Sequence, residues 1–220
     1  MTPRLAIFDC DGTLVDSQAA VCRAMEECFD AASLTPPPRA RTRRVVGLSL
    51  VEAMAALLPD DDEALHRALA EDYKRVFQRL RGWGLVEEPL FDGVVELLDA
   101  LEADGWLLGV ATGKSDRGLS HCLQCHGLRH RFVTLQTADR HPSKPNPSMI
   151  ERALADTGAE AGTSMMIGDT SYDMAMARFA GVTAVGAAWG YHSSTELKAA
   201  GAHHVAARPA DVADFVKAPA

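Results

Sequence analysis

The sequence lacks any long apolar stretch. A membrane helix needs about twenty apolar residues, and a signal peptide needs an apolar region followed by small residues. The first apolar run is already interrupted at Asp9. We therefore expect no membrane partner and a cytoplasmic location. Biased tracts that would indicate disorder are also missing, and a composition of 47% hydrophobic and 24% charged residues is typical of a globular chain.

Positive charge is scarce. The 30 Asp and Glu outnumber the 22 Lys and Arg, which gives a formal net charge of −8. Nucleic-acid binders carry a basic surface, so we expect no nucleic-acid partner. An anionic substrate must then be attracted by local positive groups or by a metal ion. We expect a monomer or a homodimer.

The cysteines do not form an even set. An odd number without an export signal favours reduced thiols, here at Cys10, Cys22, Cys28, Cys122 and Cys125. The run from Cys122 to His126 matches a haem-attachment pattern, and with His121 it offers a weak zinc alternative. Haem attachment normally requires export, and the same segment fits a helix packed through leucines, so a structural role is favoured.

Short apolar runs alternate with amphipathic stretches along most of the chain. The runs predict buried strands at residues 5–8, 107–111, 165–167 and 183–185. The stretches between them predict helices at residues 94–103, 115–127, 147–157 and 172–180. This alternation implies an α/β fold with a parallel sheet and helices on both faces, in which ligands bind beyond the carboxyl ends of the strands.

One stretch breaks the alternation. Helical patterns without strands occupy residues 19–32, 51–58 and 62–80, and Asp60 to Asp62 supply an N-cap for the last of them. We therefore predict a helical module at 17–88 inserted into a core formed by 1–16 and 89–220.

Two carboxylates follow the first predicted strand, in the run Asp9-Cys10-Asp11-Gly12-Thr13. In extended chain they project the same way, and Gly12 allows a tight turn that brings N–H groups toward an anion. Asp9 could attack phosphorus, while Asp11 could protonate the leaving group and later activate water. A simple turn or helix cap after the strand is the alternative.

Further polar groups follow the later strands. Thr112-Gly113 offers a hydroxyl and an N–H, and Lys144 is braced by the following proline. Asp169 and Asp173 are spaced to share one helix face and suit magnesium. Taken singly, each has an alternative as a turn, a surface lysine or a helix cap. Together they supply a nucleophile, an acid/base, a positive clamp and a metal site for phosphoryl transfer.

These four motifs, in this order, resemble those of haloacid-dehalogenase-like hydrolases with a helical cap. The resemblance implies a Rossmann-like core, Asp9 as nucleophile, Asp11 as general acid/base, and phosphate binding by Thr112, Gly113 and Lys144. It implies Mg²⁺ held by Asp9, the carbonyl of Asp11 and Asp169, with support from Asp173. Dehalogenase members lack the second aspartate, so Asp11 favours a phosphatase.

The tail, with Trp189-Gly190-Tyr191, resembles that of phosphoglycolate-phosphatase-like members. We therefore expect hydrolysis of a small phosphorylated metabolite through an aspartyl phosphate, with phosphoglycolate as a candidate. A phosphomutase on the same core is the alternative, and a non-catalytic binding protein is a weaker one.

The predicted cap carries arginines just before a Gly47-Leu48-Ser49 turn. Arg43 and Arg44 are candidates for binding a carboxylate or second phosphate of the substrate, and Gly47 and Ser49 for the place where the cap approaches the site. A solvated helix face is the alternative for the arginines, and a surface position is expected for Lys114.

Overall fold

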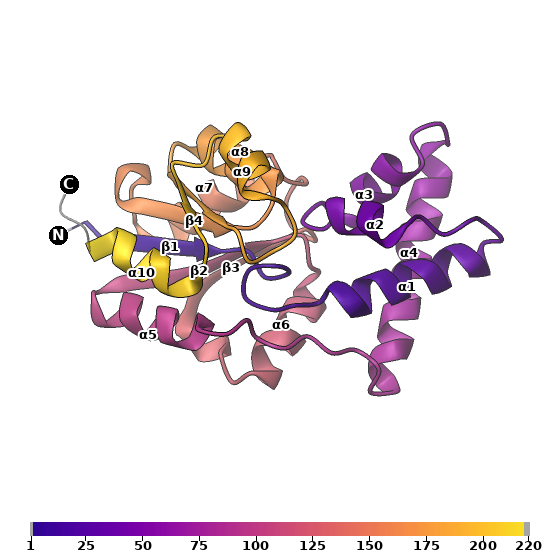
Figure 1. Cartoon of the computed structure of the whole chain (residues 1–220), viewed down its shortest axis with the longest axis horizontal. Coiled ribbons are helices and arrows are strands. Elements are labelled where there is room, and N and C mark those ends of the chain that lie inside the picture. Colours follow the sequence, from indigo (N-terminus) through magenta and orange to yellow (C-terminus); the bar gives the residue numbers. More distant parts are fainter. Residues whose placement is uncertain (1, 218–220) are drawn as a thin grey trace.

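The computed structural model describes residues 2–217 and has a parallel sheet at its centre (Figure 1). Its six strands run in the order β3-β2-β1-β4-β5-β6. They are β1 (Arg4–Phe8), β2 (Trp106–Thr112), β3 (Phe132–Thr137), β4 (Ser164–Gly168), β5 (Thr183–Ala187) and β6 (His204–Ala206). Strand order reverses between β1 and β4, and α/β sheets bind ligands in the crevice at such a switch point.

Helices cover both faces of the sheet, which confirms the predicted α/β class. One face carries α5 (Val94–Ala103), α6 (Asp116–Cys125) and α10 (Pro209–Lys217). The other carries α7 (Ser148–Thr157), α8 (Ser171–Ala180) and α9 (Ser194–Ala199), and 3₁₀ turns lie at Arg129–Arg131 and Ala161–Thr163. Alternate side chains of β1 enter the two layers, so the strand is apolar on both sides.

Four further helices stand beside the sheet rather than on it (Figure 1). They are α1 (Gln18–Ala31), α2 (Arg39–Arg44), α3 (Leu50–Leu57) and α4 (Glu63–Gly82). They enclose a buried cluster of their own that includes Phe29, Met54 and Leu69. As predicted, Asp62 caps α4, because its side chain accepts a hydrogen bond from the Leu65 N–H at 2.8 Å.

The two segments that connect these helices to the sheet lie side by side. Val15 and Leu90 form an antiparallel bridge. The Asp16 N–H donates to the Pro89 carbonyl at 2.8 Å, and the Phe91 N–H donates to the Leu14 carbonyl at 3.1 Å. The chain therefore leaves and re-enters the sheet layer at one place.

The two cysteines of the segment 122–126 lie in different surroundings, one inside the core and one at the surface. All five thiols are free, as expected. Cys122 is buried with its Sγ 3.9 Å from that of Cys10, whereas Cys125 is exposed and lies 3.4 Å from His121 Nε2. The two thiols thus face different surroundings, which favours the structural interpretation over haem or zinc. Within residues 2–217, no helix is both long and apolar enough to cross a membrane.

Candidate active site

Asp9 lies where β1 ends, beside β4 at the switch point. Its N–H donates to the Ile167 carbonyl at 2.9 Å, and its Oδ1 accepts from the Cys10 N–H at 2.7 Å. Gly12 follows with a φ of +86°, and a Cβ there would stand 2.2 Å from Asp169 Oδ2. Only glycine permits both this backbone conformation and this close approach. The loop after β1 therefore lies directly against Asp169.

Asp169 and Asp173 come from the end of β4 and the first turn of α8. Asp169 accepts from the Thr13 hydroxyl at 3.0 Å and from the Tyr191 N–H at 2.9 Å. Asp173 forms a capping box with Thr170. The helix-cap alternative is therefore correct for Asp173, yet its other oxygen faces the site. One residue thus fixes the start of α8 and contributes to the carboxylate cluster.

Lys144 is buried among these carboxylates, so the surface alternative for it is wrong. Its Nζ lies 3.0 Å from Asp9 Oδ1 and 2.6 Å from Asp173 Oδ1. Burial alone would lower the pKa of Lys144, but Asp173 and Asp9 raise it above its ordinary value. The lysine is therefore a fixed positive charge beside Asp9.

The carboxylate cluster has the composition of a divalent-cation site. Asp9, Asp169 and Asp173 each offer an oxygen, and these oxygens lie within 4.8 Å of one another. Asp9 Oδ2 is buried and has no hydrogen-bond partner among the described residues. Burial, followed by Asp173 and Asp11, raises the pKa of Asp9 to about 7 despite Lys144, and burial also raises that of Asp169. A hard cation such as Mg²⁺ fits this crowded, under-paired set of oxygens.

The Asp11 carboxylate points to a different partner. Lys114 Nζ lies 2.8 Å from Asp11 Oδ1 and 2.6 Å from Glu88 Oε1, and Arg81 lies 3.1 Å from the other oxygen of Glu88. Only 9% of the Lys114 side chain is exposed, so the expected surface position is wrong. This chain of charges, which we call the Lys114 network, joins the loop after β2 to Asp11, the connecting segment and α4.

Thr112 and Gly113 end β2 beside the helical unit. Thr112 is buried, and its hydroxyl oxygen accepts from the Lys114 N–H at 3.2 Å. A Cβ on Gly113 would stand 2.6 Å from the Leu48 carbonyl oxygen. The adjacent Ser49 N–H donates to the Ser143 hydroxyl at 2.9 Å. The loop that carries Gly47 to Ser49 therefore rests directly on the end of β2.

The structure does not bring the two candidate arginines to this place. Arg43 donates to Gln18 Oε1 at 2.7 Å, and Arg44 pairs with Glu196 at 2.5 Å. Neither belongs to the residues that line the cavity described next. Arg44 instead links α2 to α9.

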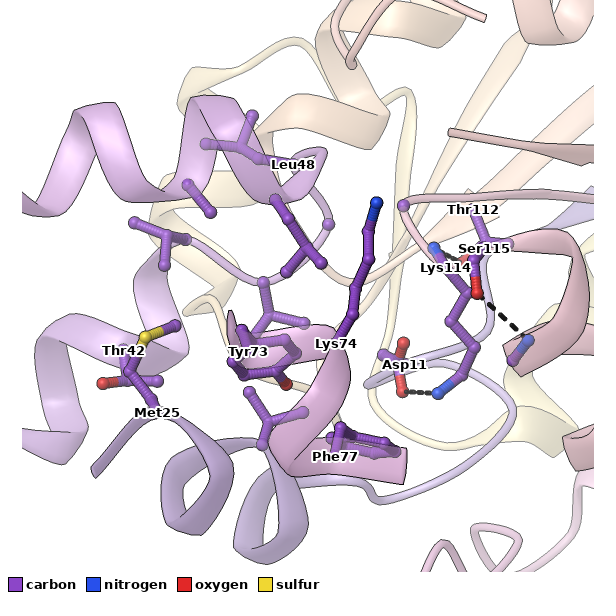
Figure 2. A pocket seen from close by; sticks show the side chains of 18 of the residues that line it. Asp11, Met25, Thr42, Leu48, Tyr73, Lys74, Phe77, Thr112, Lys114 and Ser115 are labelled. Atoms are coloured by element: carbon purple, nitrogen blue, oxygen red, sulfur yellow. Dashed lines mark hydrogen bonds and ion pairs between the residues drawn. The ribbon is translucent and has the colours of Figure 1, made fainter. Parts of the chain in front are cut away.

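A cavity of about 130 Å³ lies between the four helices and the strand ends (Figure 2). Asp9, Asp11, Thr112 and Gly113 line its floor. Its other walls include residues that sequence reasoning missed, among them Tyr73 and Phe77 of α4. Their helical spacing alone does not distinguish a cavity wall from an ordinary buried face.

Known proteins share this architecture along nearly the whole chain. The family model for haloacid dehalogenase-like hydrolases matches residues 6–187. The chain is 38% identical over 202 residues to the probable phosphatase IndB of Dickeya dadantii, across 89% of this chain and 86% of the relative. It is 31% identical over 192 residues to a phosphoglycolate phosphatase of Xylella fastidiosa, across 87% and 82%.

A solved structure agrees with these sequence matches. A hydrolase from Pseudomonas syringae superposes with a TM-score of 0.84 at 28% identity, and the match covers 98% of both chains. The strand order, the carboxylates at the switch point and the family match thus lead to one conclusion. The chain belongs to the haloacid dehalogenase-like hydrolases.

Proposed function

We propose that this protein is a phosphatase that hydrolyses a small phosphate monoester with Asp9 as the nucleophile. The observation that carries the proposal is the buried, unpartnered Oδ2 of Asp9, held beside Lys144 at the switch point of the sheet. A buried carboxylate oxygen without a hydrogen-bond partner destabilises the fold. Buried ionisable groups in such unfavourable surroundings are found most often at functional sites. The names of the relatives above support the same reaction class.

The reaction has two steps. In the first, Asp9 Oδ2 forms a bond to phosphorus while the bond from phosphorus to the ester oxygen breaks, and Asp11 gives a proton to the departing alkoxide. In the second, Asp11 takes a proton from water, whose oxygen attacks phosphorus and frees the Asp9 carboxylate. The products are the alcohol and inorganic phosphate.

The surrounding groups hold the phosphoryl oxygens. The Lys144 ammonium neutralises charge on the transferring group, while the Thr112 hydroxyl and the Gly113 N–H orient it. Asp9, the Asp11 carbonyl and Asp169 would hold Mg²⁺, with Asp173 positioning Lys144. A bound Mg²⁺ supplies further neutralisation of phosphoryl charge.

The helical unit at 17–88 acts as a cap in this proposal. Its contacts through Ser49 and the Lys114 network keep it against the strand ends, where it excludes water from the nucleophile. Excluding water lowers the effective dielectric constant, so each interaction between charges in the site becomes stronger.

Phosphate release from a panel of monoesters, with Mg²⁺ or with chelator, tests the proposal. The panel includes phosphoglycolate. Wild type should release phosphate only with Mg²⁺, and an acid quench before the second step, with substrate labelled in its phosphoryl group, should trap label on the protein. Asp9→Asn should abolish both signals, while Asp92→Asn, an exposed acid on the same core, should retain both. Substantial turnover by Asp9→Asn refutes the covalent mechanism.

A further inference from the structure

The cavity is continuous with the proposed phosphoryl site, so it receives whatever the phosphoryl group is attached to. Asp9 and Thr112 line its floor, and the remainder is lined by α1 to α4, by the loop 45–48 and by residues 113–118 between β2 and the start of α6. Figure 2 shows Tyr73 and Phe77 on the α4 side of this space, with Lys114, the partner of Asp11, 5.9 Å from the centroid of the Phe77 ring. The nature of these opposite walls therefore selects the leaving group of the ester.

Those walls are mostly apolar. The aromatic rings of Tyr73 and Phe77 lie 5.8 Å apart, centroid to centroid. The aliphatic part of the wall comes from three other segments and includes Val21, Met25, Val45 and Leu48. A hydrophilic leaving group would lose water here without gaining hydrogen bonds, whereas an apolar one gains by burial.

Three of the four cations along the cavity are already paired with protein carboxylates. Lys74 pairs with Glu71 at 2.7 Å, Arg81 with Glu88 at 3.1 Å, and Lys114 with both Glu88 and Asp11. Arg117, the remaining cation of the lining, is exposed and has no ion pair within residues 2–217. A substrate carboxylate beside Lys74, Arg81 or Lys114 would thus compete with the protein carboxylates that hold those three cations.

The space is small. A volume of 130 Å³ offers room for about ten water-sized atoms at roughly 10–15 Å³ each. The phosphoryl group takes part of this room beside Asp9, and the remainder accommodates a single ring. The hydroxyl of Tyr73, a residue of the cavity lining, can pair with one polar substituent.

Resting on the function proposed above, we infer that the substrate is the phosphate ester of an uncharged, single-ring alcohol. The ring packs against Phe77 and Tyr73 on one side and the aliphatic wall on the other. Aromatic rings stack with such side chains at centroid distances of about 4.5–7 Å. The inference runs against phosphoglycolate, whose leaving group is short and carries a carboxylate.

Steady-state kinetics of the full chain with Mg²⁺ test this with three phosphates. Benzyl phosphate carries the ring, phosphoglycolate carries the carboxylate, and acetyl phosphate is too short to reach the apolar wall. We expect kcat/KM for benzyl phosphate to exceed that for phosphoglycolate by about tenfold or more, as burial of one ring predicts. Equal values, or a preference for phosphoglycolate, overturn the inference.

Substitutions in α4 separate ring binding from the core reaction. Phe77→Ala should lower kcat/KM for benzyl phosphate by a larger factor than for acetyl phosphate, and Phe77→Leu should restore most of the loss. Trp83→Ala, an exposed aromatic just after the same helix, is the matched control and should change neither. Equal losses on both substrates in Phe77→Ala overturn the inference. If wild type hydrolyses none of the three phosphates, the proposed function itself fails.

Discussion

Replacing Glu88 with glutamine probes the Lys114 network directly. The carboxylate is largely buried and contacts two cations, Lys114 at 2.6 Å and Arg81 at 3.1 Å. A hydrogen bond to a charged group contributes about 1–1.5 kcal/mol more than a neutral one. Glu88→Gln removes the negative charge that both contacts share. It should therefore lower the free energy of unfolding by about 2–3 kcal/mol at pH 7.

The effect should depend on pH in a defined direction. Lys114 and Arg81 hold the pKa of Glu88 below its ordinary value of 4.5, against the opposing effect of burial. A depressed pKa stabilises the folded state above the unfolded-state pKa, and this contribution is lost as pH falls. The difference between wild type and Glu88→Gln should thus be full above about pH 5.5 and shrink below pH 4.5.

Urea unfolding between pH 7 and pH 4 measures this difference. Glu87→Gln is the matched control, because Glu87 is the exposed neighbour on the same segment, and its effect should stay within about 0.5 kcal/mol. If Glu88→Gln unfolds like Glu87→Gln at pH 7, the network does not stabilise the fold. A difference that persists unchanged to low pH would refute the electrostatic explanation.

Three other substitutions address the site and the cap. In chelator, Asp9→Asn should raise the free energy of unfolding at pH 8 by up to about 4 kcal/mol. Folding raises the pKa of Asp9 from 3.8 to about 7, so the wild-type protein loses stability as the pH rises through this range. Urea titrations should show that the gain disappears near pH 4. Gly113→Ala should lower kcat/KM by about tenfold, since its Cβ meets the Leu48 carbonyl, whereas Gly162→Ala, with open space around it, should have no effect. Alanine at both Arg43 and Arg44 should not raise KM for phosphoglycolate selectively over acetyl phosphate, and a selective rise would place these arginines at the substrate.

The central strands were predictable because burial on both faces makes them short, continuous apolar runs. The two edge strands were not. Phe132–Thr137 mixes buried and exposed residues with three polar side chains, and His204–Ala206 has only three residues. The polar residues of the first strand are buried, and Thr134 and Gln136 are satisfied there by hydrogen bonds to Asp156. An apolar pattern carries little signal where buried positions are polar or where the strand has only three residues.

The candidate site divides in a similar way. Asp9 and Asp169 directly follow the ends of β1 and β4, so a parallel sheet brings them together whatever the details of packing. Lys144 lies in the loop beyond Thr137, the last residue of β3, a strand that the sequence did not reveal. Lys114 could not be placed by sequence, since its partners Glu88 and Asp11 are 26 and 103 residues away and nothing local marks the pairing. The cavity walls were missed for the same reason, because apolar residues that face a cavity have the helical spacing of residues that face a core.

The paired connecting segments have a consequence for how such a chain can change over time. Asp16 and Pro89 are hydrogen-bonded neighbours, although 72 residues, numbers 17–88, separate them in the sequence. If residues 17–88 were removed, Asp16 and Pro89 could be linked directly across a very short distance, and the strands on either side would keep their register. Insertions are tolerated best where the two ends of the inserted piece meet. We therefore propose that the four helices are an exchangeable unit, which evolution can replace by another while Asp9, Lys144 and Asp169 keep their positions in the sheet layer.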